Sequence, residues 1–371
     1  MHPARQIPFD ELLAGLEKAR LAGHVGYREC PAGRRLYIYT HRCVYENGWD
    51  DFSLLARGLI LHPPTKRVIA TPFPKFFNAG ERGVPIPALP FEVFEKVDGS
   101  LGILYHFDGA WRASTKGAFE SSQARWIENR LAAQDLSALV PGTTYLTEAV
   151  YPENRIVVRY EAAELVLLAA YREDGSELHV DELSEVAAGL GWRIATRHAF
   201  TSFADLVEHA RGLPKTEEGF VVRFNDGLRL KIKGSEYQRI HALISRCTPL
   251  ALWEAMAAGD DLDAIRRDLP EEFWSDFDGI RSALAARVDG IAAKVAATAE
   301  RLAGATDKEI GLQLKSLDAE VQPLIFNWRK AGGRLDDRSK TGIFRMIRPT
   351  NNELPGYVAS YAMNRVVEEM S

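Results

Sequence analysis

The chain has 371 residues, enough for two domains, and its 46% hydrophobic and 26% charged residues are typical of a globular protein. A formal net charge of −5 excludes a protein that is basic overall, so any surface that binds nucleic acid must be local. The three cysteines, Cys30, Cys43 and Cys247, are too few and too widely spaced for a disulfide framework or a C-x-x-C metal site.

The sequence also lacks membrane and export signals. Residues 1–20 are polar and amphipathic and do not resemble a signal peptide. No stretch approaches the roughly 20 apolar residues that span a bilayer. Together with the few, widely spaced cysteines, these features predict a cytoplasmic protein without a membrane partner.

The first 240 residues predict a domain built mainly of strands. The spacing of Phe and Leu over residues 8–22 predicts a short amphipathic helix. From residue 35 to about residue 239, short segments rich in Val, Ile, Leu, Phe and Tyr predict strands, separated by turn sequences such as HPPTK and FDGAW. The predicted strands are RRLYIYT, RGLILHP, KRVIATPF, FEVFEKV, LGILYHF, TYLTEAV, RIVVRY, ELVLLAAYR, GFVVRF and LRLKIK.

Only two helices are predicted within this strand-rich region, at residues 120–134 and 181–192. An irregular mixture of this kind favours an α+β domain rich in antiparallel strands over a regular βαβ repeat.

The sequence changes character after residue 239. Residues 249–259, 262–269 and 279–305 are rich in Ala and have helical periodicity, and residues 336–371 form a mixed tail rich in Arg and Asn. We therefore predict two domains, residues 1–240 and an all-helical C-terminal domain over residues 241–371.

The segment FEKVDGSLG places Lys96 two residues before an Asp-Gly pair. Because Asp-Gly favours a tight turn and apolar runs flank it, Lys96 is predicted at the end of a strand, at a bend. If burial or neighbouring cations lower the pKa of this lysine, its amine can act as a nucleophile. The alternative from this motif alone is an ordinary surface lysine on a hairpin.

Other cations occur in patterns that suit a bound phosphate. Lys231 and Lys233 alternate along a predicted strand and so point to the same face, which suits a polyanion or, equally, plain solvation. Lys75 lies beside three aromatic residues and a proline, and is predicted to project from a packed wall. Arg57 precedes Gly58, and this glycine would permit close approach of a ligand or neighbouring backbone.

Two carboxylates and one further lysine complete the candidate site. Glu148 and Glu218 each lie at the edge of an apolar strand, where they could bind ribose hydroxyls or the water shell of Mg²⁺; taken singly, each could be an ordinary strand-end residue. Lys116 lies in STKGAF, a loop of small residues suited to phosphate.

The order of these motifs resembles a known family. K-V-D-G-S, T-E-A-V, E-G-F-V-V and K-I-K follow one another as in the lysyl-adenylate nucleotidyltransferase superfamily of ATP-dependent ligases and mRNA capping enzymes. ARGLIL, FPKFFNAGE, STKG and ENRIVVRY make the chain resemble the T4 RNA ligase 1 family over about residues 35–240. The resemblance implies a nucleotidyltransferase domain of the ATP-grasp-like ligase type.

The resemblance also implies roles for individual residues. Lys96 would take AMP onto its side-chain nitrogen, in a turn shaped by Asp98 and Gly99. Arg57, Lys75 and Lys116 resemble the family's phosphate-contacting cations, and Phe77 its required aromatic residue. The remaining implied nucleotide contacts are Glu95 at the adenine edge, Glu148 and Glu218 at the ribose or the metal's water shell, Gly219 in close packing, Lys231 and Lys233 at the phosphates, and Tyr237.

The reaction implied by the resemblance requires ATP and Mg²⁺ or Mn²⁺, and proceeds through lysyl-AMP and RNA-adenylate to join an RNA 3′-OH to a 5′-phosphate, as in tRNA repair. A monomer is expected, and a separate end-healing kinase or phosphatase is a candidate partner. Asp260 and Asp261 stand about where the family has acidic metal ligands; the alternative is that the two residues cap a helix or lie in a loop. Candidate contacts to RNA phosphates are Arg155, Arg159, Arg345 and Arg348.

Three alternatives remain open at this point. Another member of the superfamily, either a DNA ligase or a capping guanylyltransferase, would share the core motifs. A nucleic-acid-binding protein with a decayed site would share the fold without the chemistry. A regulator that binds ATP without reacting would form no covalent AMP.

Overall fold

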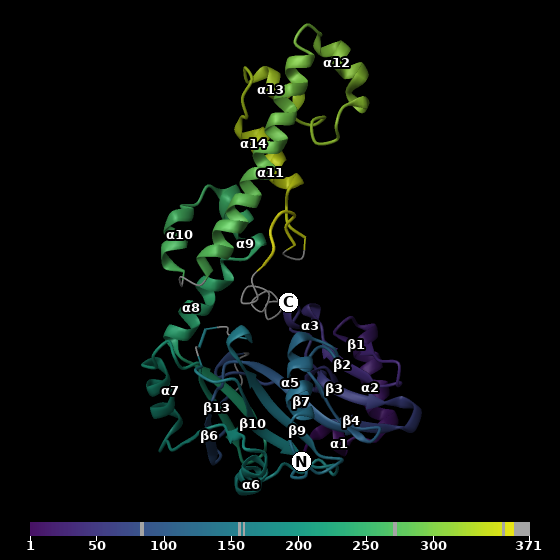
Figure 1. The fold of residues 1–371 in the computed structure, drawn as a ribbon, viewed down its shortest axis with the longest axis vertical. Coiled ribbons are helices and arrows are strands. Elements are labelled where there is room, and N and C mark those ends of the chain that lie inside the picture. The colour runs from purple at the N-terminus through teal and green to yellow at the C-terminus, as the bar shows by residue number, and fades with distance from the viewer. Residues whose placement is uncertain (82–84, 155–156, 159, 270–272, 351–352, 360–371) are drawn as a thin grey trace. The chain divides into compact units, whose positions relative to one another are not determined.

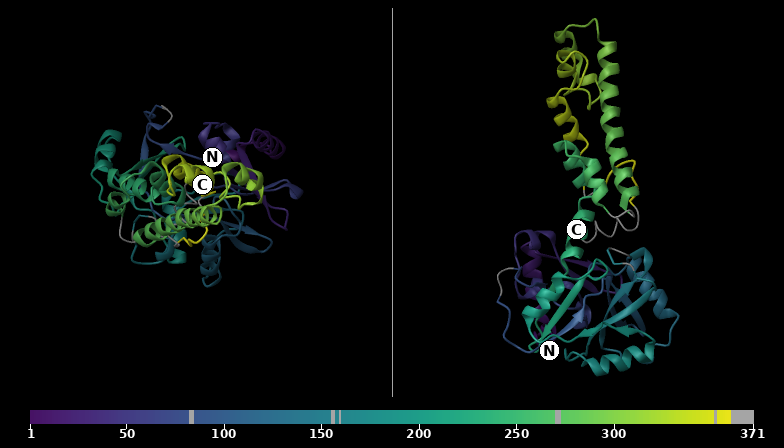
Figure 2. Two further views of the ribbon diagram at one scale, coloured as in Figure 1. Left: turned by 90° about the horizontal axis from the view of Figure 1, so that it is seen from above. Right: turned by 90° about the vertical axis from the view of Figure 1, so that its left-hand side faces the viewer.

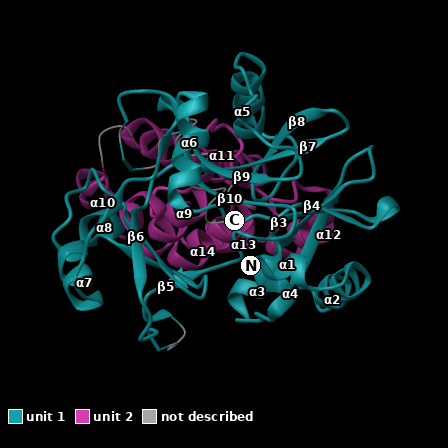
Figure 3. Ribbon diagram, turned by 90° about the horizontal axis from the view of Figure 1, so that it is seen from below, with its two compact units in different colours: residues 1–239 teal, residues 240–371 magenta. Residues whose placement is uncertain are grey.

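The computed structural model describes residues 1–81, 85–154, 157–158, 160–269, 273–350 and 353–359 (Figure 1). The chain divides into two compact units, residues 1–239 and 240–371, which Figure 3 distinguishes by colour. Unit 1 contains the strands and unit 2 is helical, so the described part of the chain has the mixed α+β composition that was predicted.

Unit 1 is built around three sheets, here called the first, second and third sheets. The first has the strand order β1-β2-β3-β4, the second β11-β10-β9-β7-β8 and the third β12-β6-β13-β14-β5. Neighbouring strands are antiparallel except for the short pairs β10–β11 and β14–β5, which are parallel. The strands are β1 (Val25–Glu29), β2 (Arg35–Tyr39), β3 (Arg57–His62), β4 (Arg67–Ala70), β5 (Phe77–Asn78), β6 (Phe91–Glu95), β7 (Ser100–Phe107), β8 (Ala110–Ser114), β9 (Thr144–Val150), β10 (Glu164–Tyr171), β11 (Arg193–Ile194), β12 (Arg197–His198), β13 (Gly219–Phe224) and β14 (Arg229–Lys233).

Helices cover the outer faces and connect the sheets. Those that begin in unit 1 are α1 (Pro3–Gln6), α2 (Phe9–Leu21), α3 (His41–Tyr45), α4 (Asp51–Leu55), α5 (Ser122–Ala132), α6 (Val180–Leu190), α7 (Phe203–Arg211) and α8 (Ser235–Ser245). Helix α2 shows why they form: Leu12, Leu16 and Ala19 recur on one face and pack with Tyr37 and Leu59 of the first sheet. Burial of each such leucine contributes about 2 kcal/mol.

The principal core of unit 1 lies between the first and second sheets. Leu36 and Ile60 of the first sheet meet Ile103 and Leu146 of the second. A smaller cluster in which Val97 meets Val150 and Val166 lies where the second and third sheets approach each other. The third sheet has its own core against α7. This arrangement places the link between β6 and β7, which contains the predicted nucleophile, at a junction of two sheets.

Several predicted elements differ from the observed ones. The helices predicted at residues 8–22, 120–134 and 181–192 are confirmed as α2, α5 and α6. Helices α3, α4 and α7 and strand β1 were not predicted. The strand predicted over RIVVRY is wrong for the residues described there, because Val157, Val158 and Tyr160 are not in a strand.

Unit 2 consists of helices joined by short loops. They are α9 (Pro249–Ala258), α10 (Leu262–Asp268), α11 (Trp274–Arg301), α12 (Asp307–Gln313), α13 (Ile325–Lys330) and α14 (Asp337–Met346). Helix α11 is the long helix of this unit (Figure 2), and it buries Phe277, Ile280 and Leu284 along one side. No helix in the described ranges has the length and apolarity needed to cross a bilayer.

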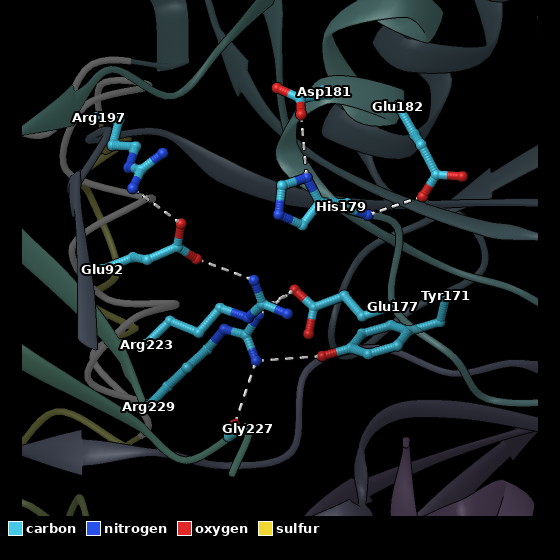
Figure 4. Close-up of polar contacts among 10 residues, drawn as sticks. All are labelled: Glu92, Tyr171, Glu177, His179, Asp181, Glu182, Arg197, Arg223, Gly227 and Arg229. Atoms are coloured by element: carbon cyan, nitrogen blue, oxygen red, sulfur yellow. Dashed lines mark hydrogen bonds and ion pairs between the residues drawn. The ribbon is translucent and has the colours of Figure 1, made fainter. Parts of the chain in front are cut away.

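A chain of ion pairs joins the second and third sheets within unit 1 (Figure 4). The guanidinium of Arg229, at the start of β14, is buried and lies over the Phe73 ring. It donates hydrogen bonds to the carboxylate of Glu177 and, over 3.3 Å, to the hydroxyl of Tyr171. Arg223 lies 3.4 Å from Glu177 and 3.1 Å from Glu92. Since β14 also contains Lys231 and Lys233, these contacts fix the strand on which two candidate site residues lie.

Replacing Glu177 with alanine would leave the Arg229 charge buried without its partner. We expect the unfolding free energy to fall by about 3 kcal/mol, because an uncompensated buried charge is far costlier than a lost surface pair. Glu208→Ala, which removes the exposed pair with Arg211, should cost less than a third of that. Urea denaturation of both variants measures the difference, and equal losses would contradict this role for Glu177.

Candidate active site

Lys96 lies on the link that carries the chain from one sheet to another. Strand β6 pairs with β12 and β13 in the third sheet, whereas β7 pairs with β8 and β9 in the second. Lys96 directly follows the last residue of β6 and Gly99 forms a bend before β7, as predicted, whereas the hairpin alternative is excluded because the two flanking strands are not paired with each other. The backbone N–H of Lys96 donates to the carbonyl of Gly219 over 2.8 Å, which attaches the link to β13.

Glu218 holds two lysines at the centre of the site. Its buried carboxylate lies 2.5 Å from the Lys96 ammonium through Oε2 and 3.1 Å from that of Lys233 through Oε1. Burial favours the neutral amine, but the charges of Glu218 and Glu148 outweigh this effect and raise the pKa of Lys96. A lowered pKa, the condition given above for a nucleophilic Lys96, is therefore not found.

Two glycines allow the backbone to pack closely around these side chains. Gly219 has φ +140°, and a Cβ there would lie 2.0 Å from the carbonyl oxygen of Ile232. Gly58 has φ +94°, and a Cβ there would lie 3.1 Å from Cα of Lys116. The close approach predicted at Gly58 is therefore one between neighbouring backbones, and it brings the Lys116 loop next to β3.

A group of cations surrounds Lys231 on β14. Burial, followed by the positive charges of four neighbours, lowers the pKa of Lys231 to about 6. These neighbours are Lys75, Lys96, Arg57 and Lys233. The charges of Arg57 and Lys116 also lower the pKa of Lys75, after the larger effect of burial, so Lys116 belongs to the same group.

The positive charge of this group is only partly balanced. Lys96 and Lys233 pair with Glu218, whereas Nη1 of Arg57 is buried without a hydrogen-bond partner among the described residues. A buried, unpaired guanidinium nitrogen in a group of cations fits an anionic ligand. The structure thus brings Arg57, Lys75, Lys116, Lys231 and Lys233 together with Lys96, from three different sheets and their loops.

Aromatic rings lie against most of these cations. Phe76 is 5.7 Å from the Arg57 guanidinium and 5.5 Å from the Lys231 ammonium, measured to the ring centroid. The Lys75 ammonium lies 5.2–5.5 Å from the rings of Tyr39, Trp49 and Phe77. Sequence reasoning identified Phe77 but missed Tyr39 and Trp49, which are distant in the chain and belong to no motif.

Hydrogen bonds of Asp98 hold the link between β6 and β7 in place. Its Oδ2 accepts hydrogen bonds from the backbone N–H groups of Val157 and Val158 at 3.0 and 2.9 Å, and its Oδ1 accepts one from the Tyr237 hydroxyl at 3.0 Å. Burial, with the nearby charge of Glu218, raises the pKa of Asp98 to about 6. Tyr160, which sequence reasoning missed, accepts the backbone N–H of Asp98 at 2.8 Å.

Gly99 and Glu148 show how closely β9 approaches the link. A Cβ on Gly99 would lie 2.6 Å from the Ala149 carbonyl oxygen and 3.0 Å from Cγ of Glu148. Glu148 comes from β9 of the second sheet, whereas Glu218 directly precedes β13 of the third sheet. The charges of both carboxylates act on Lys96.

Glu95 and Asp261, two further predicted residues, make contacts of their own. The Glu95 carboxylate is engaged by Arg193 and by the backbone N–H of Thr196 at 2.9 Å. Asp261 caps α10 by accepting from the N–H groups of Asp263 and Ala264, so the helix-cap alternative is observed. Asp260 precedes that cap in unit 2.

Of the arginines predicted to contact RNA phosphates, the structure describes Arg345 and Arg348. Arg155 and Arg159 lie outside the described residues. Arg345 is in the last turn of α14, and the guanidinium of Arg348 lies 5.5 Å from the ring centroid of Trp253 within unit 2.

The carboxylates fit a metal ion that retains most of its water. Within the described ranges, no group of three or more His, Cys, Asp or Glu side chains is placed to hold a metal. Mg²⁺ commonly binds through one or two carboxylates, substrate phosphates and water. Glu148 and Glu218 suit that mode of binding.

The chain is similar to known proteins over the region that contains these residues. A family model described as RNA ligase matches residues 55–237. A protein of Autographa californica nuclear polyhedrosis virus, provisionally named a bifunctional polynucleotide kinase/RNA ligase, is 29% identical over 239 residues, 56% of this chain and 34% of the relative. A provisionally named RNA ligase of Thermovibrio ammonificans is 29% identical over 202 residues, 50% of this chain and 52% of the relative.

A solved structure also resembles the fold. An archaeal ATP-dependent RNA ligase matches with a TM-score of 0.50 at 16% identity, over 76% of this chain and 83% of that chain. The curated relatives are longer than the regions matched, since the chain spans about a third to a half of their lengths.

Proposed function

Because residues 55–237 of this chain belong to the RNA ligase family, we propose that the protein is an ATP-dependent RNA ligase that joins a 3′-OH end to a 5′-phosphate end. The observation that supports this proposal best is the position of Lys96: it is paired with Glu218 and surrounded by cations whose charge exceeds that of the nearby carboxylates. That arrangement suits a lysine that attacks a polyphosphate.

In the first step, Nζ of Lys96 attacks the α-phosphorus of ATP. A P–N bond forms, the bond from the α-phosphorus to the bridging oxygen breaks, and pyrophosphate leaves with the electron pair. Arg57, Lys75, Lys116, Lys231 and Lys233 bind the phosphates and stabilise the charge that develops on the leaving group. Glu218 orients Lys96, and Gly219 lets β13 and β14 approach closely enough for this.

Lys96 must give up one proton to solvent before the attack, because only the neutral amine is nucleophilic, and a second as the P–N bond forms. Glu218 and Glu148 favour the protonated form in the protein without nucleotide. A Mg²⁺ or Mn²⁺ ion, held through water by Glu148 and Glu218, would supply positive charge at the phosphates. Asp98, through Tyr237 and the backbone of residues 157–158, keeps the link in place, so we assign Tyr237 a positioning role.

In the later steps, AMP moves from Lys96 to the RNA 5′-phosphate, and the 3′-OH then attacks that phosphate and releases AMP. The P–N bond suits this transfer because it is more labile than a serine ester would be. We propose broken single-stranded RNA, such as a cleaved tRNA loop, as the substrate class, with Arg345 and Arg348 as candidate phosphate contacts. The name of the viral relative combines a kinase with a ligase, which supports an end-healing kinase activity that acts together with ligation.

The test is incubation with labelled nucleotide and Mg²⁺, followed by a denaturing gel and by joining of matched RNA and DNA ends. We expect covalent label from ATP and not from GTP, and joining of RNA in preference to DNA. Label from GTP would indicate a capping enzyme, and preferential DNA joining a DNA ligase. Tight ATP binding without covalent label would indicate a regulator, and RNA binding alone a decayed site.

A further inference from the structure

Three cations of the site are held by aromatic rings in place of carboxylates. Among the described residues, Arg57, Lys75 and Lys231 have no ion-paired carboxylate, yet each lies within 5.7 Å of a ring centroid. The carboxylate whose charge acts on Lys75 is that of Glu81, which accepts hydrogen bonds from Asn78.

The rings around Lys75 and Lys231 are themselves packed together. The Trp49 ring makes edge contacts with Tyr39 at 5.0 Å and with Phe77 at 5.4 Å between centroids. Phe76 makes an edge contact with Phe73 at 6.0 Å, and Phe73 lies under Arg229. Each ring is therefore fixed by other rings, so it can define the position of the cation beside it.

An aromatic ring and a carboxylate can both hold a cation in place, but they have different effects on the net charge of the site. A carboxylate cancels the positive charge and competes with an incoming phosphate. The negative face of a ring attracts the cation through its quadrupole and leaves the net charge unchanged. Rings are therefore better neighbours than carboxylates in a site that binds a polyphosphate. They hold the cations in place, and each cation, once protonated, keeps its full charge toward the ligand.

We propose that Trp49 and Phe76 are positioning residues of the nucleotide site. Trp49 holds Lys75, and Phe76 holds both Arg57 and Lys231, while the charge of these cations stays available to the polyphosphate of ATP. This inference rests on the proposed function. It predicts that removing the ring weakens ATP binding, and that it leaves the later steps, which use no triphosphate, intact.

The test compares Trp49→Leu with Trp49→Phe, a matched pair in which both residues are smaller than Trp and only one is a ring. We expect Trp49→Leu to raise the KM for ATP in Lys96 adenylylation about 10-fold with little change in the maximal rate, and Trp49→Phe to stay within about 3-fold. Joining of pre-adenylated RNA should remain within about 2-fold of the wild-type rate for both.

The inference is overturned if Leu and Phe at position 49 give the same KM, or if the leucine variant loses both reactions equally. Phe76→Leu against Phe76→Tyr repeats the comparison should Trp49→Leu fail to fold. If the wild-type protein forms no lysyl-AMP, the proposed function fails, but the inference is still tested by calorimetry with inorganic pyrophosphate. In that assay Trp49→Leu should bind about 10-fold more weakly than the wild type and Trp49→Phe within about 3-fold of it, and equal affinities of the two variants would refute the inference.

Discussion

The Lys96→Ala variant is expected to form no covalent adenylate, with a loss of at least about 10³-fold in the rate of labelling by ATP. The reason is chemical: the neighbouring cations can bind the phosphates, but Lys96 is the side chain that the link between β6 and β7 places beside Glu218 and Glu148. No rearrangement of binding groups replaces a missing nucleophile. Single-turnover labelling with ATP and Mg²⁺ measures the loss.

Lys96→Arg is the matched control for charge. Arginine keeps a cation beside Glu218 but remains protonated and does not attack, so this variant should also fail to label while retaining the fold. Both variants should still join pre-adenylated RNA, because that substrate enters after the lysine has acted. Labelling of Lys96→Ala at a rate near that of the wild type would show that another residue carries the nucleotide.

The second large effect is expected for Glu218→Gln, with adenylylation slowed about 100-fold at neutral pH. The amide keeps the shape of the side chain but loses the charge that pairs with Lys96 and Lys233. Both ammonium groups then lose their fixed positions, one at the attacking atom and the other at the phosphates. Single-turnover rates at saturating ATP provide the measurement.

The same variant makes a prediction about pH. Glu218 raises the pKa of Lys96, and the attack needs the neutral amine, so the wild-type rate should rise with pH as Lys96 loses its proton. Removing the charge lowers that pKa, and the rising limb of the profile should move to lower pH even though the maximal rate is smaller. Glu217→Gln, a change at the exposed neighbouring residue, should leave both rate and profile unchanged. An unshifted profile for Glu218→Gln would contradict the pairing.

Local patterns predicted most strands and the longer helices of this chain, because alternation and helical periodicity are local properties. They did not predict which strands pair. The apolar runs on either side of Asp98-Gly99 left a hairpin open as an alternative, yet β6 and β7 belong to different sheets, and that choice depends on partners more than 40 residues away. Helix α7 was missed although its signals are local: Ser202 caps it, and Phe203, Leu206, Val207 and Ala210 form an apolar stripe with helical spacing.

The candidate site could be predicted where residues belong to motifs. The order of the motifs brought Lys96, Glu218 and Lys233 into one hypothesis, and the structure places their charged groups in contact. The direction of the Lys96 pKa shift could not be predicted, since it depends on whether carboxylates or cations lie nearer. The contact between the Trp49 ring and Lys75 was also missed, because the two residues are far apart in the sequence and lie close together only in the folded chain.

The most direct test of this account is to locate the nucleotide on the protein. After incubation with ATP and Mg²⁺, peptide mapping by mass spectrometry should find one adenylyl group, on the peptide that contains Lys96, and added pyrophosphate should remove it. A folded protein that acquires no adenylyl group, or acquires it on a different residue, would contradict the account.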